Sequence, residues 1–171
     1  VNGILAFETH NLDNFEKTHH EVKEYIHYEK AYNRGYYQLS SLGGGNHFLE
    51  MQQDTDGKIW IMAHTGSRGY GHQIATDFFE EGLVYSEGKL QRKNKELVNF
   101  PINSDIGKRY LNARNQAANF ALVNRYLIAQ AIIAVTEEIF KDVPEIVYEI
   151  SHNLVQFENG LWVHRKGATR A

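Results

Sequence analysis

Hydrophobic residues recur at helical spacing in three stretches of the chain. The patterns run over Leu12–Ala31, from His72 to about Glu81, and over Gly107–Phe140, which is the longest. The expected buried face of the longest pattern carries Tyr110, Ala113, Ala117, Phe120, Leu127, Ala131 and Val135. A second stripe on the same pattern carries Asn112, Asn115 and Asn119. Asn is a mediocre helix former, so this stripe is either functional or simply a solvated face.

Between the helical patterns lie runs with strand composition. His47–Gln53 and Lys58–His64 are joined by Asp54–Gly57, a turn sequence suited to a β-hairpin. Glu145–Ile150 and Leu161–Val163 are the other two predicted strands. Strands mixed with helices predict an α/β or α+β fold. At 171 residues, we expect residues 1–171 to form a single domain.

Composition narrows the classes of partner. The net charge is −3, whereas proteins that embrace long nucleic acids non-specifically are usually basic. Any contact with RNA is therefore expected to be local, and Lys89–Lys95 is interpreted first as a solvated loop. No apolar run approaches the ~20 residues of a membrane span. Because cysteine is absent and no signal peptide is visible, we expect a cytoplasmic protein without membrane association.

Three histidines fall at the ends of predicted strands. His47 opens the first strand of the hairpin and His64 closes the second, so antiparallel pairing places them side by side. His152 directly follows the Glu145–Ile150 run. Any one of them alone would be read as a packed or exposed histidine. Together they predict a transition-metal site rather than a Mg²⁺ or Ca²⁺ site, because imidazole suits such metals.

Cations and glycines near these histidines suggest phosphate binding. The loop Thr65–Gly71 lies between a strand and a helix, an arrangement that directs backbone N–H groups at an anion, but it lacks the Walker and dinucleotide patterns. Arg68 in this loop suits bidentate phosphate binding, and Lys166 and Arg170 add positive charge.

Two polar residues lie close to His47 in the sequence, Asn46 directly before it and Glu50 three residues after it. Glu50 projects from the opposite strand face, so it is a poor ligand for the same ion and either accepts N–H groups of a bound base or is solvated. Asn46 either supports a metal histidine or touches a phosphate. A serine hydrolase is disfavoured because no G-x-S-x-G elbow is present, and the absence of cysteine excludes a thiolate nucleophile.

Several motifs together resemble the RtcB RNA ligases, also called tRNA-splicing ligases. The motifs are GGGNHFLE at Gly43–Glu50, HTGSRGYGH at His64–His72, SHN at Ser151–Asn153 and HRKGATRA at His164–Ala171. The segment Asn112–Arg125 is similar to the long helix of the family. These matches occur in the order of the family and are spread over most of the chain.

The resemblance implies the RtcB-type fold and a GTP- and Mn²⁺-dependent RNA ligase. Such enzymes join an RNA 3′-phosphate or 2′,3′-cyclic phosphate to a 5′-hydroxyl, as in tRNA halves or broken RNA, through a guanylylated histidine. By motif, His47, His64 and His152 resemble the manganese ligands, and Arg68, Lys166 and Arg170 the residues that contact phosphate or RNA. The nucleotide-contacting residues implied in the same way are Asn46, His47, Phe48, Leu49, Glu50, His152 and Asn153.

The chain also departs from the family pattern. The family's metal-bridging cysteine and a neighbouring aspartate precede these motifs, and its guanylylated histidine follows HRKGATRA, so none can be assigned here. We therefore expect a fragment from the middle of the enzyme that is inactive by itself. Two alternatives stay open: a metal-dependent phosphohydrolase, which would ignore GTP, and a non-catalytic relative that binds nucleotide or RNA.

Overall fold

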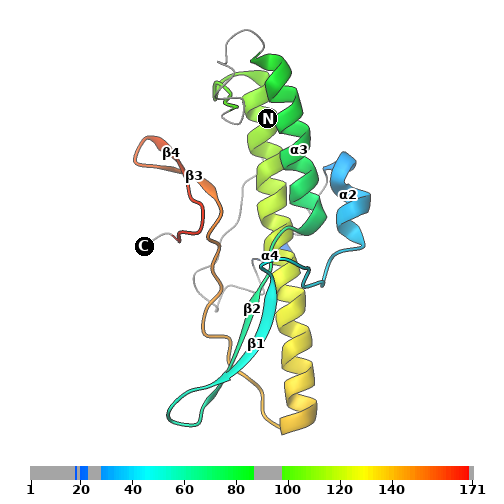
Figure 1. Cartoon of the computed structure of the whole chain (residues 1–171), viewed down its shortest axis with the longest axis vertical. Helices are drawn as coiled ribbons and strands as arrows, with labels where there is room; N and C mark the ends of the chain where they lie inside the picture. The colour runs from blue at the N-terminus through cyan, green and yellow to red at the C-terminus, as the bar shows by residue number, and fades with distance from the viewer. Residues whose placement is uncertain (1–17, 19, 23–27, 87–97, 170–171) are drawn as a thin grey trace.

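One long helix organises the molecule. The computed structural model describes residues 18, 20–22, 28–86 and 98–169. Figure 1 shows α4 running the length of the molecule, with α3 and α2 beside its upper half. In chain order the elements are α2 (Glu29–Tyr36), β1 (Phe48–Gln53), β2 (Ile59–His64), α3 (Arg68–Tyr85), α4 (Asp105–Phe140), β3 (Val155–Glu158) and β4 (Leu161–His164). Helices beside two small antiparallel sheets make this an α+β arrangement.

Helix α4 confirms the longest helical pattern and extends it by two residues at the start. The Ser104 hydroxyl accepts a hydrogen bond from the Gly107 backbone N–H (3.1 Å), which caps the helix before Asp105. At the other end Lys141 adopts a left-handed conformation (φ 58°) and stops the helix. By length and composition α4 could cross a membrane, but the core helix of a soluble protein passes the same test. The expected absence of membrane association stays a prediction.

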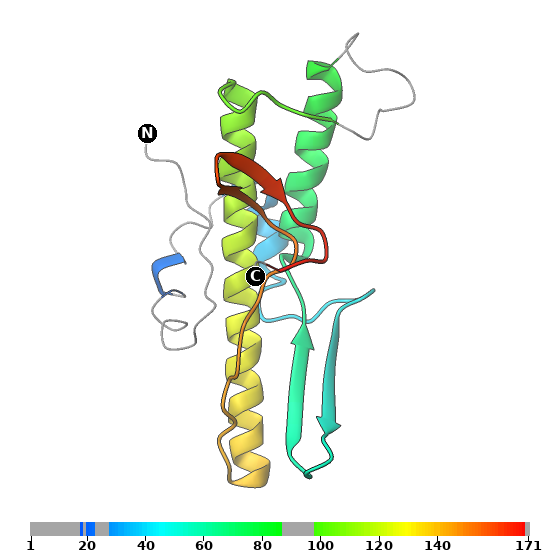
Figure 2. The same ribbon diagram turned by 90° about the vertical axis from the view of Figure 1, so that its left-hand side faces the viewer.

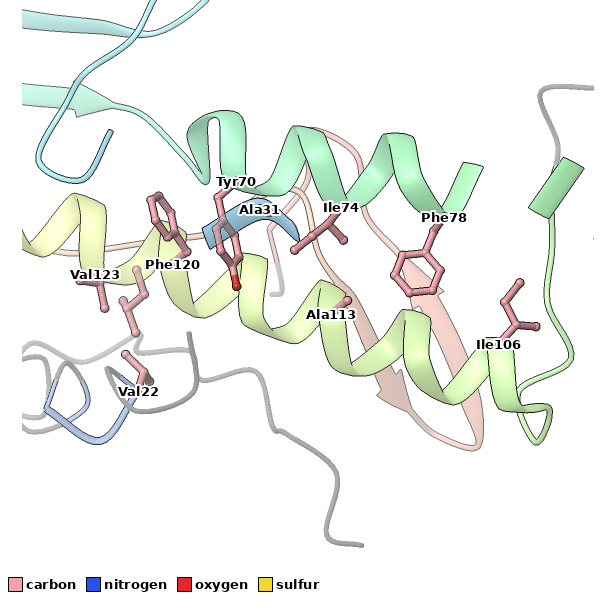
Figure 3. Close-up of a cluster of buried hydrophobic side chains, with 10 residues drawn as sticks. Val22, Ala31, Tyr70, Ile74, Phe78, Ile106, Ala113, Phe120 and Val123 are labelled. Atoms are coloured by element: carbon pink, nitrogen blue, oxygen red, sulfur yellow. The ribbon is translucent and has the colours of Figure 1, made fainter. Parts of the chain in front are cut away.

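The hydrophobic core lies between α2, α3 and the upper half of α4 (Figure 3). Tyr70 of α3 stacks on Phe120 of α4, with ring centroids 4.8 Å apart and planes 5° from parallel. Ala113 is also buried, as the helical pattern predicted. Val135, however, is 54% exposed, because α3 does not extend along the lower half of α4. The predicted buried face is therefore correct only where a second helix covers it.

The hairpin β1–β2 confirms the predicted turn and strands. Phe48 pairs with His64 and Gln53 with Ile59, in antiparallel register. The Asp54 carboxylate accepts hydrogen bonds from the backbone N–H groups of Asp56 and Lys58 and from the Trp60 indole N–H. Gly57 takes the left-handed conformation that the turn requires (φ 82°).

The predicted strand Glu145–Ile150 is wrong. After α4 the chain runs back in an extended segment without strand pairing until β3 (Figure 2). Val147 and Tyr148 are 52% and 66% exposed there, and no strand in the described part of the chain pairs with the segment. The strand that pairs with β4 is instead β3. The sequence predicted β4 but not β3.

The boundaries of two other predicted helices also differ from the structure. Helix α3 begins at Arg68 rather than His72, so the end of the expected glycine loop forms its first turn. Most of the predicted helix Leu12–Ala31 lies outside the described residues. Its described part is helical at His20–Val22, but the backbone is extended at Tyr28, the residue that precedes α2.

Candidate functional site

The structure brings His47, His64 and His152 together. The Phe48–His64 pair at the open end of the hairpin places His47 beside His64, with ring centroids 5.9 Å apart. The ring of His152, which reaches the hairpin from the segment before β3, lies 5.0 Å from that of His64. Three residues from two distant parts of the sequence thus share one half-buried cluster.

His64 and His152 face each other through their Nε2 atoms, which are 3.1 Å apart. Two nitrogen ligands at right angles on one ion, each bonded at slightly more than 2 Å, would lie about 3 Å apart. The pair therefore has the separation that joint coordination requires. The buried Nδ1 of His152 has no hydrogen-bond partner among the described residues, so this ring is not fixed by a second contact of the kind that usually orients a metal-ligating histidine.

His47 is held differently, because its Nδ1 lies 3.0 Å from Nη1 of Arg68. Arg68 can only donate, so Nδ1 accepts and the neutral imidazole carries its hydrogen on Nε2. Burial lowers the pKa of His47, and the nearby Arg68 charge lowers it further, which favours the neutral ring. In this arrangement neither nitrogen of His47 is free to coordinate.

This pairing explains why the ligand set is incomplete. Within residues 28–86 and 98–169, no group of three or more His, Asp or Glu side chains is arranged to hold a metal ion. His64 and His152 fit as two ligands of such a site, and His47 would have to leave Arg68 to become a third. Ligation by all three histidines stays a prediction.

The backbone of Arg68 itself has a strained conformation. It is the first residue of α3 and has a left-handed conformation (φ 53°). Its guanidinium lies over Gly43, where an added Cβ would be 1.8 Å from Nη1, and its Nε donates to the Ser41 hydroxyl (3.2 Å). Gly43 itself has φ 100°. The first glycine of the GGG run therefore leaves the space that the arginine fills.

The glycine loop does not present all its N–H groups to a ligand. The N–H of Gly69 donates to the Gln38 side chain (2.7 Å), and that of Gly71 donates to the Ser67 carbonyl (3.2 Å). The expected anion site at Gly66–Gly71 therefore depends on the Arg68 guanidinium more than on these two amides.

The segment that follows β4 is fastened to the segment around His152. The Gly167 N–H donates to the Asn153 side chain (2.8 Å), and the Ala168 N–H donates to the His152 carbonyl (3.1 Å). Lys166 lies exposed in this segment, whereas Arg165 forms an ion pair with Glu158. Lys166 is thus available to solvent near the cluster; Arg170 lies outside the described residues.

The residues around His47 divide between the two faces of β1. Phe48 packs edge-on against His64, with centroids 5.4 Å apart, and Leu49 is 52% exposed on the opposite face. Glu50 is exposed and accepts a hydrogen bond from the Gln52 amide (2.7 Å). Asn46 is exposed in the turn before the strand.

Sequence reasoning missed two residues behind the cluster. Asn124 is fully buried in α4, and the next residue, Arg125, pairs with Glu149 and Ser151. The available signal was a polar pair inside an apolar helical pattern. Asn119, which was assigned to the asparagine stripe, is also fully buried and therefore does not belong to a solvated face.

Comparison with known proteins identifies the family. The family model described as tRNA-splicing ligase RtcB matches residues 6–171. The chain is 36% identical to the tRNA-splicing ligase RtcB of Pyrobaculum aerophilum and 40% identical to that of Thermococcus kodakarensis, over 84% of this chain and 36% of each relative. It is 36% identical to RNA-splicing ligase RtcB homolog 1 of Entamoeba histolytica, over 84% of this chain and 32% of the relative.

The chain spans about a third of the length of these three curated relatives. The match nevertheless covers nearly all of the chain, including every motif that carries the histidine cluster and Arg68. The chain therefore belongs to the RtcB family of tRNA-splicing ligases.

Proposed function

We propose that the full-length protein is a GTP- and Mn²⁺-dependent RNA ligase, which joins RNA 3′-phosphate or 2′,3′-cyclic phosphate ends to 5′-hydroxyl ends. The observation that carries the proposal is the facing pair of His64 and His152 beside the Arg68 guanidinium. A metal ion held by two histidines next to a guanidinium is suited to holding a phosphate during group transfer. The names of the relatives, tRNA-splicing ligase and RNA-splicing ligase, support RNA as the substrate.

In this proposal His64 and His152 hold the metal, and Arg68 orients the oxygens of the transferred phosphate. Bound Mn²⁺ would stabilise negative charge that develops on the phosphate. The segments Asn46–Glu50 and His152–Asn153 contact the guanine nucleotide, while Lys166 and Arg170 contact RNA phosphate. The histidine that attacks the GTP α-phosphate, with release of pyrophosphate, is not among the residues assigned here.

The order of group transfers determines which bonds break. GMP passes from the attacking histidine to the RNA 3′-phosphate, so a phosphorus–nitrogen bond breaks as a phosphoanhydride bond forms. The 5′-hydroxyl then attacks the activated phosphate, loses its proton and displaces GMP. In both steps charge grows on phosphate oxygens, which is where a fixed guanidinium stabilises the transition state.

The test uses the full-length protein and an RNA with a 3′-phosphate and a 5′-hydroxyl. Joined RNA and pyrophosphate should form only when both GTP and Mn²⁺ are present, and a chelator should abolish the reaction. Replacement of His64 or His152 by Ala should abolish joining. His72→Ala is the matched control, since His72 belongs to the same motif but is exposed on α3. Release of phosphate without GTP would instead indicate a phosphohydrolase, and binding without reaction a non-catalytic relative.

A further inference from the structure

Asn124 connects the two segments that carry His47 and His64. Its side chain is fully buried, and its Oδ1 accepts a hydrogen bond from the Ser41 N–H (3.2 Å). Its amide nitrogen lies 3.1 Å from the Ser41 carbonyl, 3.2 Å from the Thr65 hydroxyl and 3.2 Å from the Gly66 carbonyl. Ser41 precedes the glycine run before His47, and Thr65 directly follows His64.

This amide is satisfied only when both segments are in place. A buried amide is costly unless it is hydrogen-bonded, and each partner of Asn124 lies at least 58 residues away in the sequence. The Thr65 hydroxyl in turn donates to the Leu42 carbonyl (2.7 Å), which joins the two segments directly. The Ser41 hydroxyl also accepts from Arg68, so the network reaches the phosphate-binding arginine.

Arg125 performs the corresponding role for His152. Its guanidinium forms an ion pair with Glu149, and Nη2 donates to the Ser151 hydroxyl (2.9 Å). The side chains of Arg125 and Glu149 are only 15% and 9% exposed. Ser151 directly precedes His152, in an extended segment without strand pairing. Arg125 therefore fixes a part of the backbone that no sheet supports.

We propose that Asn124 and Arg125 are a pair of positioning residues that sets the separation between the His64 and His152 rings. Neighbouring residues on an α-helix project about 100° apart, so one turn of α4 reaches segments on two different sides. Because both residues lie on α4, a single element defines the distance between the two segments. This proposal rests on the proposed metal site, and it names the two residues that fix the segments on which the metal ligands lie.

The test compares Mn²⁺ affinity in the full-length protein, measured by electron paramagnetic resonance of free Mn²⁺. Asn124→Leu removes four hydrogen bonds at similar volume, and Arg125→Met keeps the aliphatic stem without the charge. Each should weaken Mn²⁺ binding about 10- to 100-fold, as loss of supporting hydrogen bonds does at other metal sites. The matched control is Gln116→Leu. Gln116 is a buried polar residue of the same helix, and its side chain accepts a hydrogen bond from the Tyr70 hydroxyl, away from the histidines.

Milder variants cover the case in which Asn124→Leu or Arg125→Met does not fold. Thr65→Val removes one partner of Asn124, and Ser151→Ala removes one partner of Arg125; each should weaken Mn²⁺ binding several-fold. Binding within two-fold of wild type in every folded variant, or an equal loss in Gln116→Leu, would overturn the positioning role. A wild-type protein that binds no Mn²⁺ would refute the metal site itself, a result distinct from failure of the positioning pair alone.

Discussion

The three consecutive glycines Gly43, Gly44 and Gly45 allow the position of the Arg68 guanidinium to be tested by three matched substitutions. At Gly43 an added Cβ would lie 1.8 Å from Nη1 and 2.1 Å from Cζ of Arg68, and φ is 100°. At Gly45 φ is also positive (73°), but no heavy atom lies within 4 Å. Gly44 has neither a positive φ nor a close neighbour. The three alanine variants therefore separate steric displacement from backbone strain.

The expected loss of unfolding free energy follows from these differences. Gly44→Ala should change stability by less than about 1 kcal/mol, and Gly45→Ala should cost about 1–2 kcal/mol for the left-handed backbone. Gly43→Ala carries the same strain and also displaces Arg68 from His47 and Ser41, at about 0.5–1.5 kcal/mol for each hydrogen bond. Its total cost should therefore be about 2–5 kcal/mol.

Urea unfolding measures the three stabilities, and titration with GMP tests the proposed contact between the guanidinium and a nucleotide phosphate. Gly43→Ala should weaken GMP binding as much as Arg68→Ala does, whereas Gly44→Ala and Gly45→Ala should bind GMP like wild type. If Gly43→Ala matched Gly45→Ala in both stability and GMP affinity, Arg68 would not occupy the space over Gly43, and the argument for its placement would be refuted.

Three further predictions concern single residues. Arg68→Ala in the full-length protein should reduce kcat/KM for RNA joining about 100-fold, while urea unfolding shows a loss of only about 1–3 kcal/mol from its two hydrogen bonds; normal joining would remove its role. Burial raises the pKa of Tyr70 from 10.0 to about 12. Its contribution to stability is therefore fully present below pH 10, and about 3 kcal/mol is lost as the pH rises from 10 through 12; Tyr70→Phe should lack that part of the decline in alkaline unfolding curves. Ser104→Ala should cost about 1 kcal/mol through loss of the N-terminal cap of α4, and unchanged stability in thermal unfolding would show that the cap is not needed.

Local sequence patterns predicted the elements whose signals are local. The turn Asp54–Gly57 and the alternation on each side of it predicted the hairpin, and with it the proximity of His47 and His64. The apolar spacing over Gly107–Phe140 predicted α4. In both cases hydrogen bonds between residues close in the sequence form the element.

The approach of His152 to the hairpin was predicted, but most other features that depend on distant partners were not. Glu145–Ile150 has strand composition but no neighbouring strand in the described part of the chain, so composition alone misassigned it. Asn124 looked like one more polar residue on a helix, because its partners are segments 58 to 83 residues away. The hydrogen bond between Arg68 and His47 likewise depends on how the two loops pack. The sequence could therefore indicate both residues as site residues, but it could not show that Arg68 competes with a metal ion for His47.

Crystallography can show directly whether His64 and His152 jointly hold a manganese ion beside Arg68. Crystals of the full-length protein grown with Mn²⁺ and GTP should be measured at a wavelength where manganese scatters anomalously. We expect an anomalous peak within bonding distance of Nε2 of both histidines, with a GTP phosphate in contact with the Arg68 guanidinium. Manganese bound elsewhere, with the two imidazoles still hydrogen-bonded to each other, would contradict it.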